Sequence, residues 1–107
     1  MKSYTDLKQS KKLAEILSVE SADMYYEDDI SVEFGHGWHT QHIPCWSLTA
    51  LLDLCPTING KQPILTRGKL TSLWYCYYED EIDTQTYDNP IDACYEMITR
   101  LNELNLL

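Results

Sequence analysis

The sequence predicts an α+β fold, in which a small, mainly antiparallel sheet of about three strands packs with three helices in the order α-β-α-β-β-α. Two periodic segments carry this prediction: apolar residues recur every three or four positions over residues 90–104, and side chains alternate over residues 72–79. Between apolar segments, Asn59-Gly60 is a strong turn signal. A chain of 107 residues is long enough for one core without disulfides or metal, so we expect a single globular domain over residues 1–107.

The first expected element is a helix over residues 5–17, TDLKQSKKLAEIL, with apolar side chains on one side and lysines on the other. Its apolar stripe consists of Leu7, Leu13, Ala14, Ile16 and Leu17. Ser10 is an alternative N-cap, which would begin a shorter helix at Lys11. Residues 18–29, SVESADMYYEDD, break the helical period and predict a turn that leads into extended chain.

Residues 29–35, DISVEFG, predict a half-buried strand, because apolar and polar side chains alternate. The apolar face would consist of Ile30, Val32 and Phe34. A second helix follows, with Ser47 as its expected N-cap and Pro56 at its end. Its expected buried stripe is Leu48, Leu51, Leu52 and Cys55.

Residues 64–79 predict a hairpin, with strands at 64–66 and 72–79 and a turn near residues 67–69. In the second strand Trp74, Cys76 and Tyr78 alternate with Tyr75, Tyr77 and Glu79. Because both faces carry aromatic rings, this strand is expected at the centre of the sheet and not at its edge.

The last element is predicted to be a helix that begins after Asn89, with Pro90 at its first position. Asp92 lies in the first turn, where the helix dipole favours a carboxylate. Its expected buried stripe is Cys94, Met97, Ile98, Leu101 and Leu104.

The net charge of −9 is unevenly placed along the chain. Residues 13–60 contain no Lys or Arg against eight carboxylates, and residues 70–99 contain none against seven. Phosphate binding needs clustered cations, so we expect no direct nucleic-acid binding. A protein with a basic surface is the partner that this charge favours.

The compartment is expected to be the cytoplasm. The N-terminus has no continuous apolar segment of a signal peptide, and no apolar run approaches the length of a membrane span, so no membrane association is expected. In that compartment the four cysteines are expected to be reduced, and they show no CxxC spacing.

Four segments, LAEILSVESADMYY, CWSLTALLDLCP, LWYCYYE and YDNPIDACYEMITRLNELNLL, together resemble a group of small uncharacterised proteins from gut Bacteroidetes. Proteins of that group have a similar length and are often carried by phages or other mobile elements. The resemblance spans most of the chain, and the CWSL-x-ALL and DNP-x-DAC segments are its most specific parts. It implies a genomic context and no activity, cofactor or site residue.

Residues 34–46, FGHGWHTQHIPCW, contain the candidate metal ligands of the chain, because imidazole and thiolate both bind zinc. At a strict interval of three, these candidates are His36, His39, His42 and Cys45. Gly35, Gly37 and Pro44 disfavour the helix that would align them, and extended chain would send successive side chains to opposite faces. We therefore expect an exposed loop without a metal, and metal binding is the alternative.

The other candidate sites match known sequence patterns of binding or catalytic sites less well. The acidic segments 27–29 and 79–83 do not match a calcium loop and predict solvated turns. His42 and Cys45 are close in sequence, but a nucleophile and its base must meet in space, and no nucleophile elbow is evident.

The candidate interaction surface is Tyr75, Tyr77 and Tyr78, since tyrosine is enriched at interfaces. The alternative is that helices cover both faces of that strand.

These observations predict a non-enzymatic accessory protein without a cofactor, which binds another protein. One alternative is an acidic decoy that mimics DNA and occupies a nucleic-acid-binding protein, as the two cation-free stretches would permit. A second alternative is a small metal-binding protein, or a metal-dependent enzyme, that uses the histidine loop.

Overall fold

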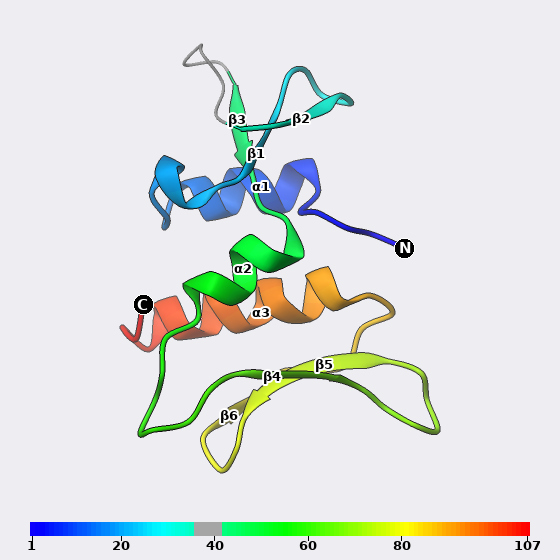
Figure 1. Ribbon diagram of the computed structural model, residues 1–107, viewed down its shortest axis with the longest axis vertical. Coiled ribbons are helices and arrows are strands. Elements are labelled where there is room, and N and C mark those ends of the chain that lie inside the picture. The colour runs from blue at the N-terminus through cyan, green and yellow to red at the C-terminus, as the bar shows by residue number, and fades with distance from the viewer. Residues whose placement is uncertain (36–41) are drawn as a thin grey trace.

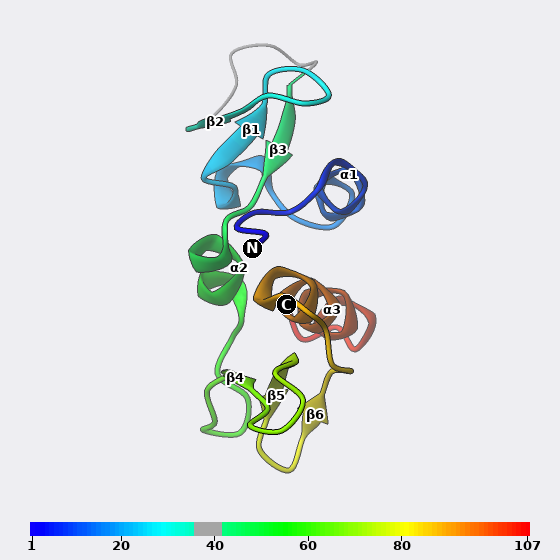
Figure 2. The ribbon, with the colours of Figure 1, turned by 90° about the vertical axis from the view of Figure 1, so that its right-hand side faces the viewer.

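The computed structural model describes residues 1–35 and 42–107, which form two three-stranded antiparallel sheets and three α-helices. The molecule measures 42 × 30 × 18 Å, and one sheet lies at each end of its long axis (Figure 1). Helices α2 and α3 lie between the sheets, and α1 packs beside the first sheet (Figure 2). The predicted α+β class is confirmed, and the strands are divided between two sheets.

Helix α1 (Leu7–Ala14) begins at Asp6, whose side chain accepts a hydrogen bond from the backbone N–H of Gln9. The Gln9 side chain in turn accepts from the Asp6 N–H, which completes a capping box. Ser10 is buried inside the helix, so the alternative helix start at Lys11 is wrong. Leu13 faces the core, whereas Ala14 is exposed, in contrast to the predicted stripe.

The first sheet has the strand order β2-β1-β3, with β1 (Met24–Tyr26) between β2 (Val32–Phe34) and β3 (Ile43–Cys45). A short 3-10 helix, Val19–Ser21, precedes β1. The sheet and α1 share a small core, which consists of Met24, Tyr26 and Cys45 with Tyr4, Leu7, Val32 and Ile43 packed against it.

The predicted apolar face of residues 29–35 is only partly buried. Val32 is half-buried, but Phe34 is 82% exposed because β2 is an edge strand. Ile30 is 87% exposed, since it belongs to a turn in which the Asp28 carboxylate accepts hydrogen bonds from the N–H groups of Ile30 and Ser31. The prediction that Ile30 and Phe34 are buried is therefore wrong, although Phe34 lies opposite Met24 and therefore on the same face of the sheet.

Helix α2 (Leu48–Leu54) begins at Ser47, as predicted, and the Ser47 hydroxyl accepts from the Ala50 N–H. Ser47 also donates its hydroxyl and its backbone N–H to the Asp23 carboxylate, which joins the helix to the segment before β1. Leu51 is fully buried, and the helix ends before Pro56.

The second sheet has the order β4-β5-β6, formed by β4 (Ile64–Arg67), β5 (Trp74–Tyr78) and β6 (Ile82–Asp83). The prediction that the aromatic strand is central is confirmed. The Asn59-Gly60 turn precedes this sheet, and both residues have positive φ, which Asn and Gly tolerate best.

Helix α3 (Pro90–Glu103) lies on one side of the second sheet and also contacts α2 (Figure 2). The Asn89 side chain caps it by accepting from the Asp92 N–H at 2.9 Å. Its fully buried side chains are Ile91, Ala93, Cys94, Met97, Ile98 and Leu101. Leu104 is 53% exposed because the helix ends there, so its predicted place in the core is wrong.

All four cysteines are buried, and none of them forms a disulfide. Burial raises the pKa of the Cys55 thiol to about 12, which favours the protonated form. Among the described residues, no helix combines the length and the apolar character needed to cross a bilayer.

Candidate functional site

Of the four candidate metal ligands, only His42 and Cys45 belong to the described residues, since His36 and His39 lie outside them. The His42 ring stacks on Tyr25, with ring centroids 4.9 Å apart. Cys45 lies three positions further along extended chain, where it shares a face with Met24. The structure therefore places the His42 and Cys45 side chains on opposite faces of the first sheet.

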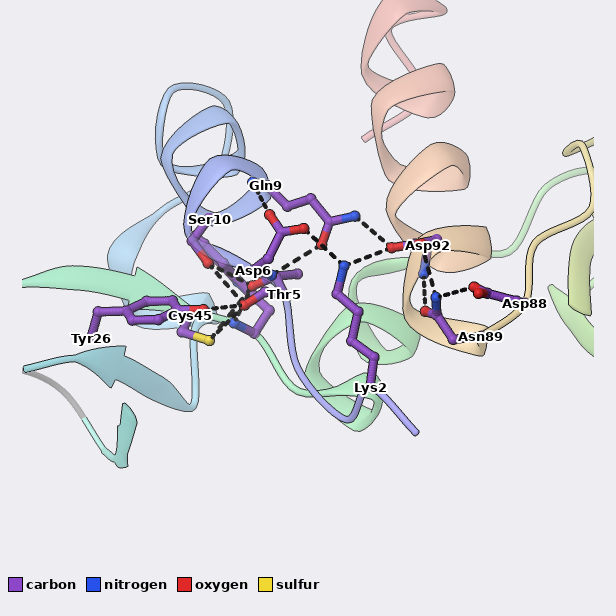
Figure 3. Close-up of polar contacts among 11 residues, drawn as sticks. Lys2, Thr5, Asp6, Gln9, Ser10, Tyr26, Cys45, Asp88, Asn89 and Asp92 are labelled. Carbon is purple, nitrogen blue, oxygen red and sulfur yellow. Dashed lines mark hydrogen bonds and ion pairs between the residues drawn. The ribbon is translucent and has the colours of Figure 1, made fainter. Parts of the chain in front are cut away.

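Cys45 belongs to a buried polar cluster between α1 and the first sheet (Figure 3). The Thr5 carbonyl accepts hydrogen bonds from the Tyr26 hydroxyl at 2.9 Å and from the Cys45 thiol at 3.4 Å. The Thr5 and Ser10 hydroxyls lie 2.7 Å apart. Burial raises the pKa of the Cys45 thiol, so neither nucleophilic attack nor metal binding is favoured at this sulfur.

The described residues contain no group of three His, Cys, Asp or Glu side chains arranged to hold a metal ion. Cys45 lies in the interior, and His42 lies on the opposite face of the first sheet. The structure therefore does not bring together these two of the predicted metal ligands, which are the ones it describes.

A second polar network joins the N-terminus to the start of α3 (Figure 3). The Lys2 ammonium lies 2.9 Å from the Asp6 carboxylate and 2.8 Å from the Asp92 carboxylate. The Gln9 side chain donates to the same Asp92 oxygen at 2.7 Å, and the Asn89 amide donates to the other. These contacts connect α1 to the first turn of α3, which indicates a structural role.

Asp92→Asn is expected to lower the free energy of unfolding at pH 7 by about 1 kcal/mol, since it removes a partly exposed ion pair at a helix N-terminus. Burial alone would raise the pKa of Asp92, but hydrogen bonds from Lys2, Asn89 and Gln9 hold it below its ordinary value of 3.8. This stabilisation is present above pH 3.8 and is lost as the pH falls through the folded-state pKa.

Urea unfolding measured between pH 7 and pH 2 tests this expectation. The difference between wild type and Asp92→Asn should shrink below about pH 4. Asp53→Asn makes the same chemical change at an exposed site on α2, outside the ion pairs of the described residues, and should retain the acid dependence of the wild type. A difference that persists unchanged at pH 2 would contradict the role of the Asp92 charge.

The second sheet has one face covered by α3 and one outer face. In an antiparallel pair, residues directly opposite each other point to the same side. The register therefore places Leu65, Cys76, Tyr78 and Ile82 on the covered face, and all four belong to the main core or pack against it. The outer face is formed by Ile64, Thr66, Tyr75, Tyr77 and Asp83. In both views no described helix lies against that outer face (Figures 1 and 2).

Tyr75 and Tyr77 are the aromatic centre of the outer face. Their rings stack with centroids 5.6 Å apart and an interplanar angle of 25°, and both side chains are half-buried. The predicted tyrosine surface included Tyr78, which is wrong, since Tyr78 is only 1% exposed. The two-residue period sends Tyr78 to the covered face with Cys76, where its hydroxyl donates to the Pro56 carbonyl at 2.7 Å.

A shallow pocket of about 360 Å³, here called the tyrosine pocket, lies where β5 turns into β6. Its lining residues are Tyr75, Tyr77, Tyr78, Asp80, Glu81, Ile82 and Asp83. The pocket thus combines the two stacked rings with three carboxylates.

The carboxylates of the tyrosine pocket differ in their partners. Glu81 accepts a hydrogen bond from Asn59 at 2.9 Å and lies 3.8 Å from the Lys61 ammonium. Asp80 has a φ of +59° in the tight turn between the strands, a conformation that Asp tolerates better than most residues. Within residues 1–35 and 42–107, the side chains of Asp80 and Asp83 take part in no ion pair. Two negative charges beside the rings are therefore available to a ligand.

Sequence reasoning found the two tyrosines but interpreted the acidic segment 79–83 as a separate solvated turn. The signal that joins them is the alternation of β5 followed by a three-residue turn at residues 79–81, which returns Asp83 to the position opposite Tyr77. Comparisons with protein-family models, with curated proteins and with solved structures found no match to this chain. The resemblance to Bacteroidetes proteins stays a prediction.

Proposed function

We propose that this chain is a non-enzymatic accessory protein that binds another protein through the outer face of the β4-β5-β6 sheet. The observation that carries the proposal is the stacked, half-buried pair Tyr75 and Tyr77, on a face against which no helix of the described residues lies. Tyrosine is enriched at protein interfaces because its ring is large, rigid and partly polar. The rings would bury apolar area against a partner while their hydroxyls keep a polar contact.

Charge indicates the kind of partner. The chain carries a net charge of −9, and four carboxylates lie within residues 79–83 beside the outer face. A partner with a basic surface would be attracted to this end of the molecule, and unlike charges would raise the association rate. The interior position of Cys45 supports a binding role over a catalytic one, because a buried protonated thiol does not serve as a nucleophile.

The test is capture of a partner by the immobilised protein from a lysate of the organism that encodes it, followed by mass spectrometry. The double variant Tyr75→Thr/Tyr77→Thr removes both rings and retains residues that favour strands. Phe34→Ala is the matched control, since it removes an exposed aromatic ring from the other sheet. Circular dichroism and the melting temperature should show that both variants fold.

The expected result is a protein retained by the wild type and by Phe34→Ala and lost with the double variant. A captured protein that binds the folded double variant equally well would contradict the proposal. A captured protein that is displaced from the chain by duplex DNA would also contradict the proposal, because that result would identify the chain as a DNA mimic.

A further inference from the structure

We infer that the tyrosine pocket accepts an arginine side chain from an extended basic segment of the partner, an inference that rests on the proposed function. The pocket lies near the lower end of the volumes found for ligand sites, roughly 300–1,000 Å³. Its volume suits one long side chain. Its lining includes the two stacked rings and three carboxylates, which favours a flat organic cation over an anion or an apolar group.

The aromatic part of the pocket favours a guanidinium. A planar cation is attracted to the face of an aromatic ring, and arginine makes such contacts more often than lysine. The described part of the chain shows a contact of this kind, in which the Arg67 guanidinium carbon lies 5.9 Å from the Trp74 ring centroid. Tyr75 and Tyr77 are half-buried, so part of each ring surface remains accessible to a second guanidinium supplied by a partner.

The acidic part of the pocket supplies the counter-charge. Glu81 is already paired with Lys61, which leaves Asp80 and Asp83 for an incoming cation. Asp83 lies directly opposite Tyr77 in the strand register, on the same face of the sheet. A guanidinium beside Tyr77 would therefore be close to a carboxylate, and its several N–H groups suit paired hydrogen bonds to carboxylate oxygens.

Lysine fits the pocket less well than arginine. An ammonium group is strongly hydrated and compact, so it loses more water on contact with the rings and offers no flat surface to them. A metal ion is a poorer fit again, since calcium and magnesium need several converging oxygen ligands and the described residues contain no such group.

Three synthetic peptides test the inference, each a glycine-serine chain with arginine, lysine or citrulline at the same alternating positions. Citrulline has nearly the shape of arginine and lacks its charge. Binding to the 107-residue chain is measured by fluorescence anisotropy, and the site is located by amide chemical shifts. The arginine peptide should bind most tightly and the citrulline peptide least, with the largest shifts at Tyr75, Tyr77, Asp80 and Asp83.

Variants separate the ring contribution from the charge contribution. Tyr77→Leu should weaken binding of the arginine peptide about two- to fivefold, the range expected for an exposed cation–π contact, while Tyr77→Phe should retain it. Asp80→Asn/Asp83→Asn should weaken it further, most strongly at low salt. The control Glu20→Gln/Glu103→Gln removes two exposed carboxylates elsewhere and should have a much smaller effect.

Equal binding of the arginine and lysine peptides would overturn the inference, as would an equal effect of the pocket variant and the charge-matched control. Either result would indicate only general attraction to an acidic chain. Absence of peptide binding, combined with tyrosine-dependent capture of a partner, would overturn the arginine inference and leave the proposed function standing. Capture that does not depend on the tyrosines would overturn both.

Discussion

Removal of residues 90–107 is expected to abolish cooperative unfolding. Helix α3 supplies seven buried residues, including Ile91, Met97, Ile98 and Leu101, and it covers the inner face of the β4-β5-β6 sheet. Burial of these four large side chains contributes about 6–12 kcal/mol at roughly 1.5–3 kcal/mol each. That amount is comparable to the total stability of a typical domain, about 5–15 kcal/mol.

The measurement is a thermal or urea transition followed by circular dichroism. The shortened chain, residues 1–89, should show a broad and non-cooperative change, because Cys76 and Tyr78 would lose their cover. Removal of residues 105–107 alone is the control, since this segment is exposed and follows the helix. A sharp transition in residues 1–89 would show that α3 is not required for the core.

Leu101→Ala is expected to lower the free energy of unfolding by about 2–5 kcal/mol, the range found for fully buried leucines. Leu101 is 0% exposed, in the last buried position of α3. The loss has two causes, because truncation removes buried methyl groups and leaves a cavity that neighbouring side chains fill only in part. Urea denaturation with linear extrapolation gives the value directly.

Leu104→Ala provides a matched control one helical turn away. The same atoms are removed, but Leu104 is 53% exposed at the end of the helix, so the expected loss is below about 0.5 kcal/mol. Similar losses at both positions would contradict the assigned orientation of α3. A loss at Leu104 alone would show that the stripe continues beyond the helix end.

The helices were the part of the fold that sequence reasoning predicted best. Ser47 caps α2 as expected, α3 begins after Asn89 as expected, and Pro56 and Pro90 mark a helix end and a helix start. These signals are local, because a cap bonds to a backbone N–H only a few residues away. The wrong predictions of burial at Ala14 and Leu104 concern helix ends. The elements that cover the helix stop there, and the helical period alone does not show where they stop.

The short strands were predicted less well. Strands β1, β3 and β6 are two or three residues long, which is too short for an alternation to be recognised. They exist because distant segments supply their hydrogen-bond partners, and that pairing is not encoded in any local pattern. For the same reason, the single sheet expected from the sequence is two sheets in the structure.

In the candidate site, too, some features follow from the local sequence and others from contacts between distant segments. The alternation of β5 determines by itself that Tyr75 and Tyr77 lie on one face and Tyr78 on the other, because successive side chains of a strand point in opposite directions. The sequence likewise determines the acidic charge and the N-cap of α2, and the aromatic side chains on both faces of β5 predicted its central position in a sheet. Only the tertiary structure decided which face α3 covers and that Asp83 returns beside Tyr77. Those two results depend on contacts between segments far apart in the chain, where packing selects the arrangement that buries the most apolar surface.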